Sequence, residues 1–185
     1  MNKKKHRLLH GSSGFSMAEM LLAMLILMMA SAILAQGVPL AVDIYEKIVD
    51  SANAQVLLST TMVRLRDEIG LTTEIISHNK YEVELKTANY PFNIIIRQPQ
   101  SEEQYKMIQI EYKSDPLYSA DLISPEAATN GLIVCFDEIS VDTSDSGDVV
   151  KSVKIENLQV VKEGRDTPYC TSDLVIRMLA RPKLK

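Results

Sequence analysis

The stretch GSSGFSMAEMLLAMLILMM, Gly11–Met29, places one carboxylate, Glu19, at the head of a long apolar run. The run continues to Val42, so Met20–Val42 provides 23 residues without a charge. At ~1.5 Å of helical rise per residue this is roughly 35 Å, enough to cross the ~30 Å hydrocarbon core of a bilayer. A carboxylate at the head of such a helix is costly unless a cation pairs with it.

The charge before Glu19 is entirely basic and comes from Lys3, Lys4, Lys5 and Arg7. Basic residues on the N-terminal side of a membrane helix predict that this end stays in the cytoplasm and that the rest faces outward. The chain carries a net charge of −4, and removal of residues 1–14, which carry +4, leaves −8. An acidic body of this kind gives no reason to expect nucleic-acid binding.

Two familiar kinds of N-terminal segment share parts of this pattern. A secretory signal peptide would combine the basic start with the apolar core Met20–Met29 and a small-x-small site at Ala30-Ser31-Ala32. Glu19 and the apolar residues beyond that site argue against it. An uncleaved membrane anchor explains the lysines and the length, but it leaves Glu19 without a role.

Gly14-Phe15-Ser16-Met17-Ala18-Glu19 resembles the cleavage signal of type IV pilins and pseudopilins. In that family a short basic leader ends in Gly, Phe follows, Glu is the fifth residue of the mature chain, and a long apolar helix comes next. Ser16 and Met17 replace the commoner Thr and Leu. The resemblance covers about the first 45 residues.

The resemblance implies that prepilin peptidase cuts between Gly14 and Phe15 and methylates the new amino group of Phe15. It also implies that Glu19 pairs with the N-terminal amine of a neighbouring subunit when the helices pack into a filament. The residues agree with this expectation, because no Lys or Arg lies between Arg7 and Lys47. A buried carboxylate needs a cation, and the Phe15 amine is the nearest one in the mature segment.

The helix is expected to continue beyond the apolar run. Gly37 and Pro39 predict a kink or local opening, since proline cannot donate to the carbonyl four residues earlier. Gly70 is a candidate C-cap. We therefore expect a leader over 1–14, a membrane or filament-core helix over 15–42 and an amphipathic helix over 43–70. The stripe predicted to pack on a sheet consists of Ile44, Ile48, Ala52, Val56 and Val63.

Residues 71–185 are predicted to form an extracytoplasmic β-rich domain. Alternating or compact apolar patterns predict short strands separated by turns and without a second helical pattern. Together with the long helix this predicts an α+β fold, a pilin-like long N-terminal helix packed on an antiparallel sheet. The predicted strands are 81–86, 92–97, 107–113, 132–136, 149–155 and 174–178, with 158–161 extending one of them or forming a seventh.

Few residues of the body suggest chemistry, and we expect neither an enzyme nor a cofactor. His78 lies in an apparent loop without partners for catalysis. Asp142, Ser144 and Ser146 have oxygens at alternate positions before Gly147, as in a calcium loop, but Val153 occupies the position of the bidentate Glu. A flexible acidic turn is the alternative interpretation.

Cys135 and Cys170 are the only cysteines. In an exported domain they could form one disulfide bond. The alternative is two free thiols, with Cys135 in the core inside the apolar segment 132–136.

The sequence thus favours a structural subunit, a minor pilin or pseudopilin, of a type IV pilus, type II secretion or competence-type filament. Its expected partners are prepilin peptidase and other pilin or pseudopilin subunits. Its expected location is the cytoplasmic membrane, with the N-terminus inside and the C-terminal domain outside, and then a cell-surface or periplasmic filament. The alternative is a single-pass anchor that holds an extracytoplasmic binding or sensor domain.

Overall fold

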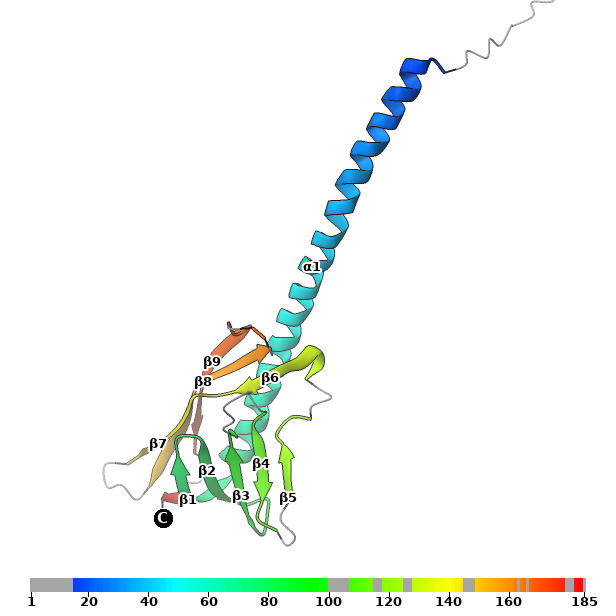
Figure 1. Ribbon diagram of the computed structural model, residues 1–185. Coiled ribbons are helices and arrows are strands. Elements are labelled where there is room, and N and C mark those ends of the chain that lie inside the picture. The colour runs from blue at the N-terminus through cyan, green and yellow to red at the C-terminus, as the bar shows by residue number, and fades with distance from the viewer. Residues whose placement is uncertain are drawn as a thin grey trace, which may run out of the picture. The chain divides into compact units, whose positions relative to one another are not determined.

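The computed structural model describes residues 15–99, 107–114, 118–124, 128–144, 149–162, 164–165, 167–178 and 182–184. Its first element is one helix, α1 (Met17–Gly70) (Figure 1). The chain divides into two compact units, Met1–Glu46 and Lys47–Lys185. The helix contributes to both units, so its two halves are described separately.

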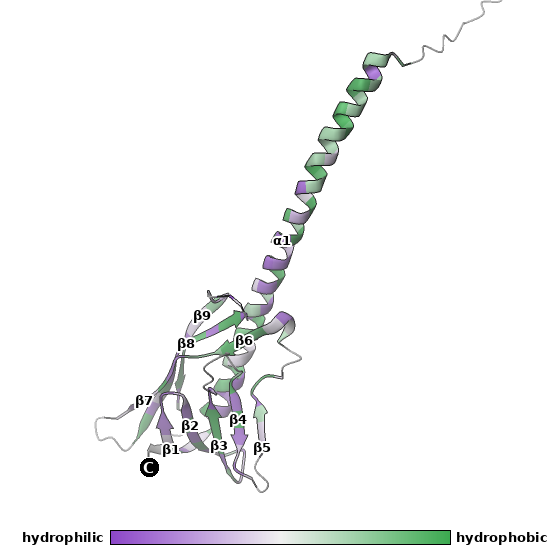
Figure 2. Ribbon diagram, in the orientation of Figure 1, coloured by the Kyte–Doolittle hydropathy of each residue, from purple (hydrophilic) through white to green (hydrophobic). Residues whose placement is uncertain are grey.

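The N-terminal half of α1 is apolar on every side. All residues from Phe15 to Ile48 are exposed, and the hydropathy colouring is mostly green over this half (Figure 2). The helix is long and apolar enough to cross a membrane, as the sequence predicts. It continues without a break through Gly37 and Pro39.

The C-terminal half of α1 buries one stripe of residues. Its apolar members are Ala54, Leu57, Leu58, Leu65 and Ile69, which recur at spacings of three and four. The sequence-based prediction of which stripe packs on a sheet was wrong. The larger members of the predicted stripe, Ile44, Ile48, Val56 and Val63, are all about half exposed or more. At 100° per residue, Val56 and Val63 lie on nearly the opposite side of the helix from the buried stripe.

The helix ends at Gly70, as predicted. No positive φ is needed there, since the glycines with left-handed backbone among the described residues are Gly131 and Gly164. The chain turns directly into the first strand, and the N–H of Ala88 donates to the carbonyl of Leu71 at 3.1 Å.

The first sheet has six strands in the order β10-β1-β2-β3-β4-β5. Neighbouring strands from β1 to β5 are antiparallel, whereas β10 runs parallel to β1. The strands are β1 (Thr72–Asn79), β2 (Glu82–Thr87), β3 (Asn93–Arg97), β4 (Gln109–Tyr112), β5 (Tyr118–Asp121) and β10 (Lys183–Leu184).

The second sheet is built on one long strand, β8 (Val150–Lys162). β6 (Leu132–Cys135) and β7 (Glu138–Thr143) pair with successive stretches of one edge of β8, and β9 (Cys170–Arg177) pairs with the other edge. A short 3-10 turn, η2 (Thr129–Gly131), precedes β6. Between Ile155 and Leu158 the register with β9 shifts at Asn157, whose φ is 52°, so β8 contains a bulge.

One hydrophobic core joins the buried stripe of α1 to both sheets. Ile75, Ile94 and Ile155 are fully buried in it, from strands β1, β3 and β8. The sheets are also linked through the backbone, because the N–H of Ile139 donates to the carbonyl of Lys80 at 2.9 Å.

The α+β class is confirmed, with a refinement of the sheet. The predicted single antiparallel sheet is two sheets, one of which includes a parallel pair. Strands β2, β3, β4, β6 and β9 lie where apolar patterns predict them, and 149–155 and 158–161 together form β8. Strands β1, β5, β7 and β10 were missed.

Candidate functional site

The head of α1 is held by a reciprocal capping arrangement. The backbone N–H of Glu19 donates to Ser16 Oγ at 3.2 Å, and the N–H of Ser16 donates to Glu19 Oε2 at 2.8 Å. This is a capping box, with Ser16 at the N-cap and Glu19 three residues later. The carboxylate also lies at the positive end of the helix dipole. Glu19 therefore has a local role that its position in an apolar run did not suggest.

The residues around this cap are open to their surroundings. Phe15 is 81% exposed and Met17 is 85% exposed. The cap uses Oε2 of Glu19, whereas Oε1 accepts no hydrogen bond from any of the described residues. The head of the helix thus presents an exposed aromatic ring and one carboxylate oxygen that the cap does not use.

The predicted cut after Gly14 lies outside the described residues, as does the basic leader over 1–14. Phe15, the residue predicted to carry the methylated amine, is the first described residue and directly precedes the N-cap. The kink predicted at Gly37 and Pro39 stays a prediction, although neither residue ends the helix. A side chain at Gly37 would meet nothing within 4 Å.

The weaker candidates of the body are not brought together. His78 is exposed near the end of β1. Asp142 belongs to β7, in register with Ser152, and the N–H of Ser144 donates to the carbonyl of Val149 at 2.7 Å. Ser146 lies outside the described residues. Among the described residues, no three His, Cys, Asp or Glu side chains form a group that could hold a metal ion.

Cys135 and Cys170 are free thiols in this structure, so the predicted disulfide is not formed. They flank β8 on opposite edges, opposite Gln159 and Val160 respectively. Two strands that flank a third lie about 10 Å apart, beyond the ~7 Å limit for a disulfide, and consecutive β8 residues face opposite sides of the sheet. Burial raises the pKa of Cys135 to about 11 and also raises that of Cys170, so both thiols stay protonated near neutral pH.

The buried carboxylate of Asp50 on α1 was not predicted from the sequence. Asp50 is only 6% exposed and accepts three hydrogen bonds. Lys162 Nζ donates to Oδ2 at 2.6 Å, Tyr169 Oη donates to Oδ2 at 3.0 Å, and Asn130 Nδ2 donates to Oδ1 at 2.9 Å. These contacts, chiefly those of Lys162 and Asn130, hold the pKa of Asp50 below its usual value. The cluster fastens the helix to the turn before β6 and to the facing ends of β8 and β9.

The chain was compared with protein-family models, curated proteins and solved structures. No protein-family model, curated protein or solved structure matches the chain.

Proposed function

We propose that the chain is a minor pilin or pseudopilin, a filament subunit whose first 14 residues are removed by prepilin peptidase. The observation that carries this proposal is the junction Gly14-Phe15 placed directly before a capped helix with Glu19 in its first turn. Cleavage there keeps the apolar helix in the product and creates an ammonium group at Phe15. The leader, the junction and the helix then each have a function.

The N-terminal half of α1 supports assembly through the helix. It exposes apolar side chains on all sides from Phe15 to Val42, which suits the lipid bilayer first and the packed helices of a filament later. The predicted stripe, with Ile44, Ile48, Val56 and Val63, adds exposed apolar side chains farther along the helix. We assign this stripe to contacts with other subunits.

Glu19 would serve two partners in such a filament. Oε2 caps its own helix, while Oε1 is available to the Phe15 ammonium of a neighbouring subunit. A carboxylate moved into an apolar filament core requires such a cation. In this proposal the chain stays in the cytoplasmic membrane, with its body outside, until it is assembled.

The capping box also favours a second candidate function. Because Ser16 and Glu19 satisfy each other's backbone donors, Glu19 is explained even if no second subunit binds it. The chain would then be a single-pass anchor holding an extracytoplasmic binding or sensor domain.

Mass spectrometry of the N-terminus separates the two functions. The chain purified from membranes that contain a prepilin peptidase should begin at Phe15 and carry one methyl group, whereas Gly14→Val should keep the full leader. An intact Met1 in the wild type would support the plain anchor, and a start at Ile33 would indicate a cleaved secretory signal.

A further inference from the structure

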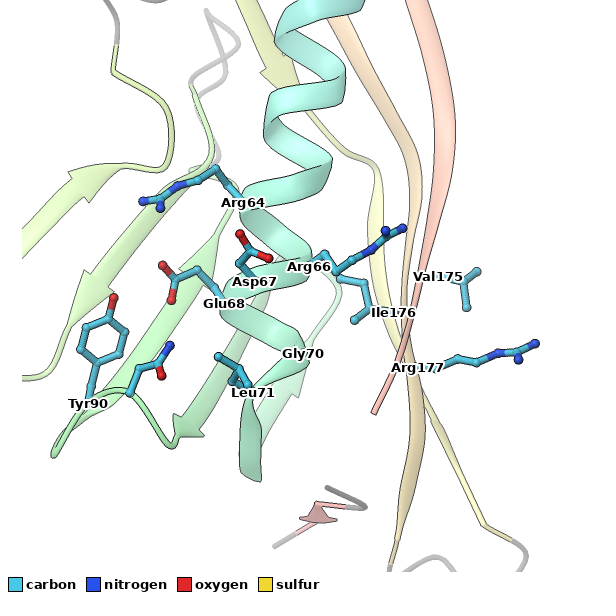
Figure 3. A pocket seen from close by; sticks show the side chains of 11 residues that line it. Arg64, Arg66, Asp67, Glu68, Gly70, Leu71, Tyr90, Val175, Ile176 and Arg177 are labelled. Atoms are coloured by element: carbon cyan, nitrogen blue, oxygen red, sulfur yellow. The ribbon is translucent and has the colours of Figure 1, made fainter. Parts of the chain in front are cut away.

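A groove of about 1,020 Å³ lies at the C-terminal end of α1 (Figure 3). The last turns of the helix, the β2–β3 turn at Asn89 and Tyr90, and the end of β9 line it. It belongs entirely to the C-terminal unit. Its volume is at the upper limit of ordinary small-ligand pockets, which leaves room for an extended peptide.

The rim of the groove is basic. Arg64, Arg66 and Arg177 are exposed there, and none of them forms an ion pair within 4 Å among the described residues. Asp67 is the exposed acid of the lining. Glu68 is only 5% exposed, and its carboxylate lies near the hydroxyl group of Tyr90, so it adds little to the surface charge (Figure 3). A basic rim on an acidic chain is complementary to an acidic partner.

The end of β9 offers unpaired backbone groups beside this rim. β9 pairs with β8 on one side, and no described strand pairs with its other side. The N–H of Met178 donates to the carbonyl of Lys151 at 3.0 Å, and Ile176 is in register with Val153. In an antiparallel ladder the bonded residues alternate, so the N–H and C=O of Val175 and Arg177 point away from β8.

Apolar side chains lie next to this free edge. Leu71 is 43% exposed and lines the groove together with Ile176, which is only 3% exposed. Val175 is 51% exposed but lies on the same face of β9 as Arg177 (Figure 3). An extended, hydrophobic strand edge is ordinarily protected, and it pairs readily with another strand when it is left open.

We propose that this groove binds an extended partner segment as an additional strand on β9, with acidic and apolar side chains alternating along it. The backbone of the segment pairs with Val175 and Arg177. Its acidic side chains lie on the face of Arg177, and its apolar side chains lie on the opposite face, where they cover Leu71. This interface is independent of the proposed filament function, because it uses neither Phe15 nor Glu19.

The test uses the full-length chain in detergent micelles and a fluorescent peptide, acetyl-Thr-Glu-Val-Glu-Val-Glu-Val-Thr-amide. Fluorescence anisotropy should show saturable binding, and a peptide with Lys in place of Glu should not bind. Arg177→Glu should weaken binding about tenfold, because an attractive cross-strand pair becomes repulsive. Lys86→Glu, which makes the same charge change at an exposed site on β2, is the matched control and should leave the affinity unchanged.

Val175→Pro tests the backbone pairing. It removes an N–H that points away from β8, so near-UV circular dichroism should show an intact fold while peptide binding is lost. Val175→Thr is its control and should retain binding. Absence of saturable binding by the wild type would overturn the proposal, as would unchanged affinity in Arg177→Glu. Binding that persists in Val175→Pro would overturn strand addition and indicate a purely electrostatic contact.

Discussion

The N-terminal half of α1 has many more apolar residues than the C-terminal half, and the two halves use them differently. From Phe15 to Ile48 every residue is exposed, whereas from Asp50 onward one stripe enters the core. The buried stripe even includes polar residues, namely Asp50, Thr61 and Glu68. Apolar spacing therefore identifies a helix face but does not tell which partner covers it. The two sheets of the same chain cover one face, and we assign the exposed apolar residues to the membrane and to other subunits.

The largest expected effect comes from the buried stripe. Leu65 is fully buried, so Leu65→Ala should lower the free energy of unfolding by about 2–5 kcal/mol through lost contacts and a cavity. Denaturant unfolding of the full chain in micelles, followed by the near-UV signal of the tyrosines, measures this. Val63→Ala, at a 55% exposed site two residues away, is the control and should change the free energy by less than about 0.5 kcal/mol. Equal losses of unfolding free energy in the two variants would show that the stripe predicted from the sequence also packs in the core.

The Asp50 cluster should be the next most sensitive feature. Asp50→Ala leaves Lys162, Asn130 and Tyr169 without their shared acceptor and should cost about 2–4 kcal/mol in the same unfolding experiment. Asp43→Ala, at an exposed site on the same helix, should have little effect. If both variants were equally stable, the cluster would not hold the helix to the body.

The same cluster predicts a pH dependence. Since its contacts, led by Lys162, lower the pKa of Asp50 in the folded state, the unfolded chain binds this proton more readily. The stabilisation is complete above the ordinary aspartate pKa of ~3.9 and is lost as the pH falls through the lowered value. The difference in unfolding free energy between wild type and Asp50→Asn should therefore be constant from about pH 8 to pH 5 and shrink below about pH 4. A difference that grows on acidification would contradict the assignment.

The smallest effect is expected at the capping box. Ser16→Ala removes one acceptor and should cost the first turn about 1 kcal/mol, which corresponds to roughly fivefold faster hydrogen exchange at the amide of Glu19. Ser31→Ala, which removes a hydroxyl that donates to the Leu27 carbonyl in mid-helix, is the control and should leave that amide unchanged. Unaltered exchange in Ser16→Ala would show that the cap contributes nothing.

Local pattern was enough to predict the helix and six of the ten described strands. β2 alternates cleanly, and β3 is a compact apolar run, so both follow from the sequence. β1 reads Thr-Thr-Glu-Ile-Ile-Ser-His-Asn and shows no such alternation, because its place in the sheet comes from its neighbours. β7 was missed because Asp142 was assigned to a turn, although Ile139 and Val141 alternate before it.

The capping box and the Asp50 cluster differ in whether the sequence alone could have predicted them. The capping box needed only the spacing Ser-x-x-Glu before an apolar run, a signal that was present but not used. The partners of Asp50 lie 80, 112 and 119 residues away, at Asn130, Lys162 and Tyr169. No local pattern connects such positions, so only the fold could bring them together.

Incorporation of Glu19 variants into filaments tests the central claim, that the exposed half of α1 is an assembly element. Glu19→Ala and wild type would be compared in cells with the native assembly system, together with Ser16→Ala, which weakens the cap but retains the carboxylate. We predict that Glu19→Ala is still cleaved before Phe15 but enters filaments much less than either of the others. Equal incorporation of Glu19→Ala and wild type would contradict the claim and leave Glu19 as a helix cap alone.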